Sequence, residues 1–515
     1  MNHQSTDRQP RLAELLAALS LAADLGNGVP METTLRVCLL TTRLAHEAGL
    51  RDDDLGAAYY TGLLWSAGCT ATSHEERVRF GDDLGLKRAM AGADFERPAE
   101  ILRRAAGIGE GWGASARLQG LSGMLRHGQT HGQAIAVAHC EAAASLASRL
   151  GLGTKVKEGL GAFFEYWNGR GGPARISGEA IPAPARAARL AYEAVHALRV
   201  GDDPARVVRS RAGGELDPAL AATFEKRARD LMAGLDQESV WSEALEVEPE
   251  PRPWAPASRV DIFAAALGDL VDLKSVFWLG HSSSVARLTD AAAGGMHINK
   301  EETVLLRRAS LIHGLGRVAV SNRIWDKPGP LSPAEWERVR LYPYFTDRVV
   351  SRAPALANVV RPASGAQERL DGSGYHRGLP AAAQPVAMRL LASAAAYQSM
   401  TEDRPHRPAL DNRAAAAELR AEAAAGRLDG EAVGAVLEAA GHPRPRGDWP
   451  AGLTDREVQV LRLVARGNTN RQVAGALSIA EETARNHIKH IYDKIGISSR
   501  AGAAMYAMEH GLFIA

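Results

Sequence analysis

The sequence predicts an all-α protein, from its composition and from the spacing of its apolar residues. Alanine, leucine and arginine dominate the 515-residue chain, and aromatic residues make up only 5% of it. The abundant residues favour helix intrinsically, whereas runs of strand-forming residues are nearly absent. Apolar residues recur at three- and four-residue steps, the helical period, as in the series Ile262, Phe263, Ala266, Leu267, Leu270 and Val271.

Composition and charge indicate a soluble globular protein. The hydrophobic share of 46% and the charged share of 23% are ordinary, and the net charge of +1 excludes a chain that is basic throughout. Cys38, Cys69 and Cys140 lack CxxC spacing, so we expect reduced thiols in a cytosol. The N-terminus shows no signal-peptide pattern, and no run of about 18 apolar residues could span a bilayer. We therefore expect a cytoplasmic protein without membrane contact.

Two stretches rich in proline and charge predict the domain boundaries. The first, "EVEPEPRPWAPAS", covers 246–258, and the second, "GHPRPRGDWPAG", covers 441–452. Because proline blocks helix continuation and stiffens the chain, both stretches are predicted to be linkers. The predicted domains are then 1–245, 258–440 and 452–515.

The first two predicted domains share one sequence plan. Both contain the pattern Glu-x-x-[Asn/Asp]-Gly-x-Gly, which starts at Glu165 and at Glu368. Each glutamate lies 26 residues after a second landmark, His139 in one domain and Tyr342 in the other. Further upstream, "GLLWSAGC" matches "SLIHGLGR". We expect two related helical domains in tandem.

The segment 452–515 has the pattern of a helix-turn-helix unit. Thr454 and Glu457 form a capping box at a helix start, and Gly467 is placed to end that helix. A second helix is predicted to open at Thr469. After the turn "SIAEE", the buried face of a third helix falls at steps of four, three and four: Ala484, Ile488, Ile491 and Ile495. Two helices joined by a short turn place the second helix in the major groove of DNA.

This segment resembles the LuxR-type helix-turn-helix family over nearly all of its length. The matching stretches are "LTDREVQVLRLVARG", "TNRQVAGAL", "ETARNHIKHIYDKIGISSR" and "AMEHGL", and one departure is Ala484, where the family usually has valine. The resemblance implies a four-helix domain that binds double-stranded DNA as a homodimer. It places the DNA contacts at Thr469, Asn470, Thr483, Arg485, Asn486, His487, Lys489 and Lys494.

Among these residues, Arg485 is the predicted base reader, because a guanidinium pairs bidentately with guanine. Lys489 and Lys494 are predicted to hold phosphates. The alternative is a helical tail that mediates oligomerisation, since 452–515 contain eight Lys/Arg against six Asp/Glu, a net charge of +2. Capping, turn and periodicity together favour DNA binding.

The middle segment resembles the HD-GYP phosphodiesterases over about 258–410. The resemblance is carried by "LVDLKSVFWLGHSSSVARL", "ASLIHGLGRVAVSNRIWDKPGPLSPAEWERV", "AQERLDGSGYHRGLP" and "RLLASAAAYQSMTEDRPHRPAL". It implies a binuclear metal centre that polarises a phosphate and generates hydroxide.

Most ligand positions that this resemblance implies hold other residues. His281 and His313 stand at ligand positions, but Gly314 replaces the aspartate of the His-Asp pair, and Arg317 replaces a catalytic lysine. The remaining positions hold Tyr342, Ala366, Gln367 and Ala395. Because alanine and glycine offer no side-chain ligand, we predict no metal, no cofactor and no catalysis.

The first segment departs further from the same pattern. Trp65 stands at the histidine of the His-Asp pair, Phe163-Phe164 replaces a His-His pair, and Tyr192 lies where a late aspartate belongs. These bulky side chains predict hydrophobic filling of the centre or an apolar ligand pocket.

Polar residues around the centre of the middle segment form a candidate pocket for an anionic ligand: His281, His313, Arg317, Glu368, Arg369, Asp371 and Arg377. The alternative is that both histidines are hydrogen-bonded core residues, and that Asp371 and Gly374 only keep a tight turn.

The sequence thus predicts a DNA-binding transcriptional regulator and not an enzyme, with two inactive HD-type domains as a sensory or dimerisation platform. Its predicted partners are double-stranded DNA, a second copy of the chain and a small-molecule or nucleotide ligand. Two alternatives stay open: an active metal-dependent cyclic-dinucleotide phosphodiesterase fused to a DNA-binding domain, and a protein–protein scaffold without a ligand.

Overall fold

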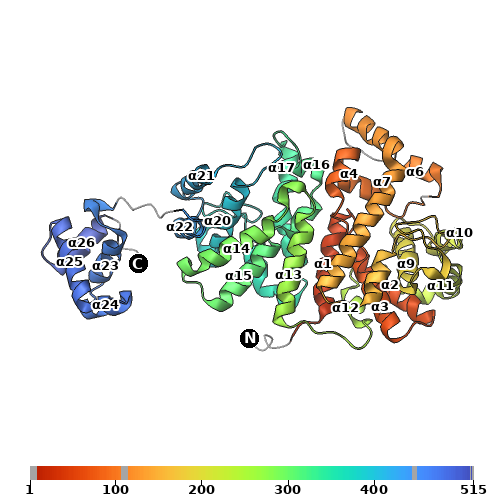
Figure 1. Ribbon diagram of the computed structural model, residues 1–515, viewed down its shortest axis with the longest axis horizontal. Helices are drawn as coiled ribbons and strands as arrows, with labels where there is room; N and C mark the ends of the chain where they lie inside the picture. The colour runs from red at the N-terminus through yellow and green to blue at the C-terminus, as the bar shows by residue number, and fades with distance from the viewer. Residues whose placement is uncertain (1–8, 95, 106–113, 443–448, 511, 513–515) are drawn as a thin grey trace. The chain divides into compact units, whose positions relative to one another are not determined.

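The computed structural model describes residues 9–94, 96–105, 114–442, 449–510 and 512. All regular elements among these residues are helices, so the all-α prediction is confirmed (Figure 1). No helix in the described part of the chain is long and apolar enough to cross a membrane. Contacts divide the chain into two compact units, 1–440 and 441–515.

In the described part of its first half, the larger unit contains twelve α-helices: α1 (Leu12–Gly26), α2 (Thr33–Glu47), α3 (Asp52–Leu64), α4 (Ser73–Phe80), α5 (Asp83–Met90), α6 (Pro98–Ala105), α7 (Ala114–Arg149), α8 (Thr154–Gly161), α9 (Ala183–Arg199), α10 (Pro204–Arg211), α11 (Pro218–Leu231) and α12 (Trp241–Glu246). The second half contains α13 (Ala257–Asp272), α14 (His281–Ala293), α15 (Lys300–Ile312), α16 (Asn322–Trp325), α17 (Pro333–Arg340), α18 (Tyr342–Val350), α19 (Ala357–Ser364), α20 (Val386–Met400), α21 (Asn412–Ala424) and α22 (Gly430–Ala439). Short 3-10 helices lie between them: η1 (Gly178–Ala180), η2 (Val276–Trp278), η3 (Gly294–Met296), η4 (Leu315–Ala319), η5 (Pro354–Leu356) and η6 (Ala381–Ala383).

The stretch 246–258, predicted to be a linker, does not separate two units. One hydrophobic core runs from Leu12 to Leu437 and joins the segments 1–245 and 258–440. The stretch itself pairs with the start of the chain, because the backbone amide of Leu12 donates to the Pro253 carbonyl at 2.9 Å. Glu248 within it is buried and accepts a hydrogen bond from the hydroxyl of Tyr60. Prolines end the helix here as expected, but the chain beyond them is packed.

The two halves of the larger unit repeat the same contacts. In the first half, Asp24 accepts hydrogen bonds from the amide and the hydroxyl of Thr34, at 3.0 and 2.6 Å. In the second half, Asp272 accepts from the amide and the hydroxyl of Ser282, at 2.7 and 2.8 Å, again ten residues on. The two aspartates lie near the ends of equivalent helices, α1 and α13, so the repeated sequence plan corresponds to a repeated structure.

Two glycine positions repeat as well. A Cβ atom on Gly316 would overlap the carbonyl oxygen of Tyr342, and one on Gly68 would overlap the carbonyl oxygen of His139. Both positions therefore require the absence of a side chain. The glycine that matches Gly316 therefore approaches the residue that matches Tyr342 in the same way, so the sequence pairs Gly68/Gly316 and His139/Tyr342 are also structural equivalents.

The smaller unit contains η7 (Pro450–Gly452), α23 (Asp455–Ala465), α24 (Asn470–Leu477), α25 (Glu481–Ile495) and α26 (Arg500–Glu509). Thr454 and Glu457 form the predicted capping box, and Thr469 forms a second one with Gln472. Ala484, Ile488 and Ile491 are buried in the core of this unit as predicted. The stretch 441–452 lies partly outside the described residues.

Candidate functional site

Two buried histidines and one arginine meet at the centre of the second half. His281 begins α14, His313 directly follows α15, and Arg317 lies in η4. Both histidines are fully buried, and Arg317 is 4% exposed. The Nη2 atom of Arg317 lies 3.3 Å from Nε2 of His281 and 3.3 Å from Nε2 of His313. The structure therefore brings three of the predicted pocket residues together.

The outer nitrogens of both imidazoles are occupied by hydrogen-bond acceptors. Nδ1 of His281 lies 2.7 Å from a carboxylate oxygen of Glu402, and Nδ1 of His313 lies 2.6 Å from the carbonyl oxygen of Ser310. Each Nδ1 must therefore carry the proton, which leaves the Nε2 lone pairs directed at Arg317. Burial and the charge of Arg317 lower the pKa of His281 to about 4 and that of His313 well below its usual range, so both rings are neutral at pH 7.

Aromatic rings enclose the guanidinium of Arg317. Its central carbon lies 3.8 Å from the ring centre of Trp278 and 5.5 Å from that of Tyr342. Trp325 donates its indole N–H to the carbonyl oxygen of Arg317 at 3.1 Å. A Cβ atom on Gly314 would lie 2.9 Å from Nη1 of Arg317, so the missing side chain at Gly314 leaves the space that the guanidinium fills.

The other predicted pocket residues act within their own loop. Glu368 is buried and accepts hydrogen bonds from the amides of Arg377 and Leu379, each at 2.9 Å. Asp371 is exposed and accepts from the amide of Ser373 at 3.0 Å, which closes a tight turn. Hydrogen bonds from the hydroxyl and the amide of Ser373 also lower the pKa of the Asp371 carboxyl.

The two arginines of this loop have partners nearby as well. Arg377 pairs with Asp347 at 2.6 Å, and Arg369 donates to the carbonyl of Glu368 at 2.9 Å. The bonds of Glu368, Asp371, Arg369 and Arg377 thus hold the conformation of residues 368–379.

Three residues of the centre were not predicted from the sequence. Trp278 lies under Arg317, Trp325 holds the backbone of Arg317, and Glu402 orients His281. The aromatic residue in "VFWLGH", three positions before His281, was a signal for an enclosed cation. Glu402 gave no local signal, since it lies 121 residues from its partner.

The described side chains of this centre are not arranged as a binuclear metal site. Among these residues, two imidazole nitrogens converge, and both face the guanidinium of Arg317. Ala366 and Ala395 are buried and bring no donor side chain. Within the described residues, no group of three or more His, Cys, Asp or Glu side chains is arranged to hold a metal ion.

The equivalent centre of the first half is filled by stacked rings. Trp65 stacks on Phe163 with ring centres 5.0 Å apart and meets the edge of Tyr192 at 4.7 Å. His139 is buried, and its Nε2 contacts the Trp65 carbonyl. Burial lowers the pKa of His139 to about 4. The hydrophobic filling expected from the sequence is present.

Beside these rings lies a buried group of two arginines and two glutamates. Arg189 and Arg211 each form ion pairs with both Glu193 and Glu215. Burial and the neighbouring Glu215 carboxylate raise the pKa of Glu193 above its usual range, against the opposing pull of the two arginines. The group joins α9 to α10 and to the segment that follows α10.

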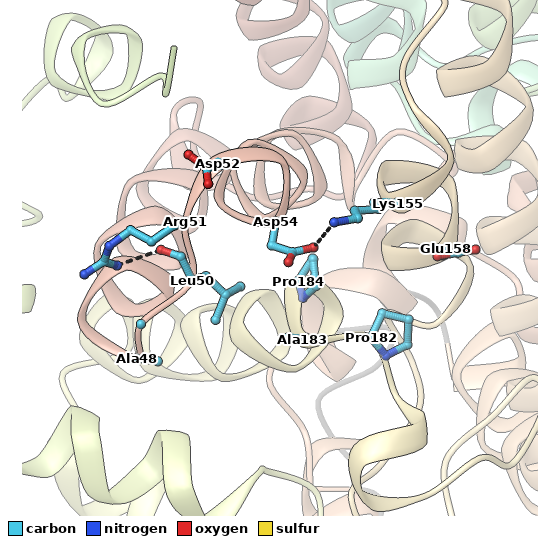
Figure 2. Close-up of a pocket in the computed structure, with 11 residues that line it drawn as sticks. Ala48, Leu50, Arg51, Asp52, Asp54, Lys155, Glu158, Pro182, Ala183 and Pro184 are labelled. Atoms are coloured by element: carbon cyan, nitrogen blue, oxygen red, sulfur yellow. Dashed lines mark hydrogen bonds and ion pairs between the residues drawn. The ribbon is translucent and has the colours of Figure 1, made fainter. Parts of the chain in front are cut away.

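A surface pocket of 610 Å³ lies between α3, α8 and α9 (Figure 2). An ion pair of 2.6 Å between Lys155 and Asp54 crosses it, and Arg51 donates to the carbonyl of Leu50 at 2.7 Å. None of the predicted site residues lines this pocket.

The predicted DNA-contacting residues lie on α25 and at the start of α24. Thr483, Arg485, Asn486 and Lys489 are exposed on α25, and His487 is half-buried. Arg485 forms an exposed ion pair with Glu482 at 2.9 Å. The surface formed by these five residues of α25 carries the donors and charge that base and phosphate contacts need.

The other three predicted contacts take part in the structure of the smaller unit. Thr469 caps α24, and Asn470 accepts a hydrogen bond from Arg500 at 2.7 Å. Lys494 forms an ion pair of 2.7 Å with Glu457, the residue that completes the capping box of α23.

Models of known protein families match segments of both the larger and the smaller unit. Residues 265–432 match the model of the HD domain, and residues 451–507 match the model of the luxR family of bacterial regulatory proteins. The chain therefore contains an HD domain over 265–432 and a C-terminal LuxR-type helix-turn-helix domain over 451–507.

Individual proteins of known function are similar to each of these two segments. The chain is homologous to HD-GYP-type enzymes: it is 28% identical over 410 residues to the 3'3'-cGAMP-specific phosphodiesterase 3 of Vibrio cholerae, which covers 78% of this chain and 88% of that protein. The crystal structure of a cyclic GMP-AMP specific phosphodiesterase of V. cholerae shares the fold, with a TM-score of 0.58 at 24% identity over 84% of this chain and 98% of that chain. The DNA-binding transcriptional activator DevR/DosR of Mycobacterium tuberculosis is 34% identical over 82 residues, 16% of this chain and 38% of that protein.

Proposed function

We propose that this protein is a DNA-binding transcription regulator whose HD-type unit has no phosphodiesterase activity and serves as a platform for dimerisation and ligand sensing. The observation that carries the proposal is the position of Arg317, between the two histidines that remain at ligand positions. Hydrolysis by a binuclear centre needs cations at that point, with open positions for water and substrate.

The C-terminal unit supports the DNA-binding part of the proposal. Its α25 presents Arg485 and Lys489 to solvent after a capped α24 and a short turn. One such domain makes few phosphate contacts, and its affinity falls steeply with salt. We therefore propose a homodimer that binds two half-sites.

The burial of the centre in the second half limits how the HD-type unit could bind a ligand. His281 and His313 are fully buried, and the rings of Trp278 and Tyr342 flank the guanidinium of Arg317, so these three side chains present no open polar surface. A ligand of the platform would therefore act by displacing the rings or by binding elsewhere.

Electrophoretic mobility shift on promoter fragments tests DNA binding. We expect the full-length protein to shift a subset of fragments and Arg485→Ala to weaken that binding by about 5- to 150-fold, the equivalent of one bidentate base pairing. Arg206→Ala, an exposed arginine of the larger unit, is the matched control and should bind as the wild type does. Undiminished binding by Arg485→Ala, or none by the wild type, would contradict the proposal.

The second candidate, an active phosphodiesterase, is favoured by the identity to the V. cholerae enzyme. Incubation of the purified protein with 3'3'-cGAMP or cyclic di-GMP and Mn²⁺ distinguishes an inactive regulator from an active phosphodiesterase. We expect no linear product. Metal-dependent turnover would show that the HD unit is an enzyme, while a rise in melting temperature without turnover would identify a ligand, because selective binding stabilises the folded state.

A further inference from the structure

We propose that Arg317 takes the structural place of a metal cation in the HD centre, and that its removal uncovers a two-histidine site for a divalent transition metal. This inference goes beyond the proposed function, since it concerns what holds the centre together and does not depend on DNA binding.

The orientation of the two imidazoles is the first support. A histidine that binds a metal directs one ring nitrogen at the ion and donates the N–H of the other to an oxygen. His281 and His313 have this arrangement: Glu402 and the Ser310 carbonyl take the outer N–H groups, and both Nε2 atoms converge on Nη2 of Arg317. The guanidinium thus receives the lone pairs that a metal would receive.

The fit of the arginine is the second support. Gly314 has no side chain at the point where a Cβ would come within 2.9 Å of Nη1, and Trp278 places its ring face 3.8 Å from the guanidinium carbon. A desolvated cation over an indole is stabilised by the quadrupole of the ring. These residues together accommodate one positive charge that is covalently attached to the chain.

Arg317 and a metal ion exclude each other at this position. The Nη2 atom lies 3.3 Å from both Nε2 atoms, whereas a zinc-like ion would lie about 2.1 Å from each of them. Two like charges at this separation in a buried site repel strongly. The wild-type centre should therefore remain folded without metal and take none up.

Cobalt titration of the full-length protein tests the inference. The proteins are wild type, Arg317→Met, and Arg317→Met combined with His313→Ala, each freed of metal with EDTA. Methionine keeps an unbranched side chain and removes the charge. Co²⁺ binding is followed by visible absorption and by the melting temperature of the larger unit.

We expect EDTA to leave the melting temperature of the wild type unchanged and Co²⁺ to give no saturable signal that depends on His313. Arg317→Met should bind one equivalent, and loss of His313 should weaken that binding at least tenfold. Gly314→Asp added to Arg317→Met should tighten it at least tenfold, because a carboxylate there projects into the space left by the guanidinium. If Arg317→Met is unfolded without metal, Co²⁺ should restore its helical circular dichroism, again through His313.

Two results would overturn the inference. One is an Arg317→Met protein that shows no saturable Co²⁺ binding, whether folded or unfolded. The other is a wild type that binds Co²⁺ through His313 as tightly as the variant does. Neither result touches the mobility-shift assay, and a failed mobility shift would leave the cobalt result standing, so the two proposals fail separately.

Discussion

The guanidinium carbon of Arg317 lies 3.8 Å from the ring centre of Trp278. The same indole ring also contacts Arg404, whose guanidinium carbon lies 3.9 Å from the ring centre. One aromatic side chain therefore supports two cations, of which Arg317 is almost fully buried and Arg404 is 9% exposed. Glu402 balances part of this charge through its contacts with Arg404 and His281, each 2.7 Å long.

Replacement of Trp278 should destabilise the larger unit according to how much of the ring is removed. We expect Trp278→Ala to lower the free energy of unfolding by about 3 kcal/mol, through weaker packing and the absence of cation–π attraction, and Trp278→Phe by about 1 kcal/mol. Thermal melting of the full chain measures both. Trp336→Ala, at a tryptophan that is 45% exposed, is the matched control and should change little. Equal losses of stability in Trp278→Ala and Trp336→Ala would contradict the role of Trp278 in supporting the Arg317 guanidinium.

Glu368 should matter far more than Asp371, although both belong to the same loop motif. Glu368→Ala leaves the amides of Arg377 and Leu379 without their acceptor, and we expect a cost of about 2–4 kcal/mol. Asp371→Ala removes an exposed turn contact and should cost less than about 1 kcal/mol. Limited proteolysis within 368–379, together with melting, distinguishes them. The opposite order would mean that Asp371 has a role beyond the turn.

Removal of Lys489 should change the salt dependence of DNA binding, whereas removal of Lys494 should change the stability of the smaller unit. Lys489 is exposed on α25, and Lys489→Ala should reduce the slope of log affinity against log salt concentration by about 0.9 for each phosphate that the variant no longer neutralises. Lys494→Ala breaks the ion pair with Glu457 and should first lower the melting temperature of the smaller unit. Binding measured across a salt series gives both slopes. An equal reduction of slope in the two variants would establish Lys494 as a phosphate-binding residue.

His196 should make the larger unit sensitive to acid. It is buried against Tyr192, with ring centres 4.3 Å apart. Burial and nearby arginines, Arg199 foremost, lower its pKa to about 3. Below a pH of about 6.5, His196 binds a proton in the unfolded chain but stays neutral in the folded chain. Protonation therefore stabilises the unfolded state, and the free energy of unfolding decreases as the pH falls.

The variant His196→Phe isolates that contribution. It keeps the ring contact with Tyr192 and cannot titrate, so the wild type should lose about 2 kcal/mol relative to the variant between pH 7.5 and pH 5. Urea unfolding at both pH values provides the comparison. A difference that does not change with pH would show that the pKa of His196 is the same in the folded and the unfolded chain.

Gly68 and Gly316 should be equally intolerant of a side chain. Alanine at either position places a Cβ atom against a backbone carbonyl, that of His139 or of Tyr342, and we expect losses above about 4 kcal/mol or failure to fold. Gly329→Ala meets nothing within 4 Å and serves as the control. Soluble yield and melting temperature give the readout. A mild effect at one position alone would mean that the halves differ in backbone there.

Local signals predicted the smaller unit well. The capping box of Thr454 and Glu457, the helix start at Thr469 and the buried face of α25 all follow from residues close in sequence. The repeat in the larger unit was also visible, because the Glu-x-x-[Asn/Asp]-Gly-x-Gly pattern recurs 26 residues after His139 and after Tyr342.

Contacts between distant residues were not predictable in the same way. The sequence identified His281, His313 and Arg317 as neighbours of one centre, but not that the arginine would lie between the imidazoles. That position depends on Trp278 and on the space at Gly314, and the histidine orientation depends on Glu402. The joined core of 1–440 likewise arises from packing across hundreds of residues, which no local pattern records.

The loop 368–379 has one more consequence. Its shape rests on Glu368 and on backbone amides, none of which needs the chemistry once associated with such loops. A chain could therefore change side chains elsewhere in the centre without disturbing this loop. The motif at 368–379 follows from the demands of architecture and is by itself no sign of turnover.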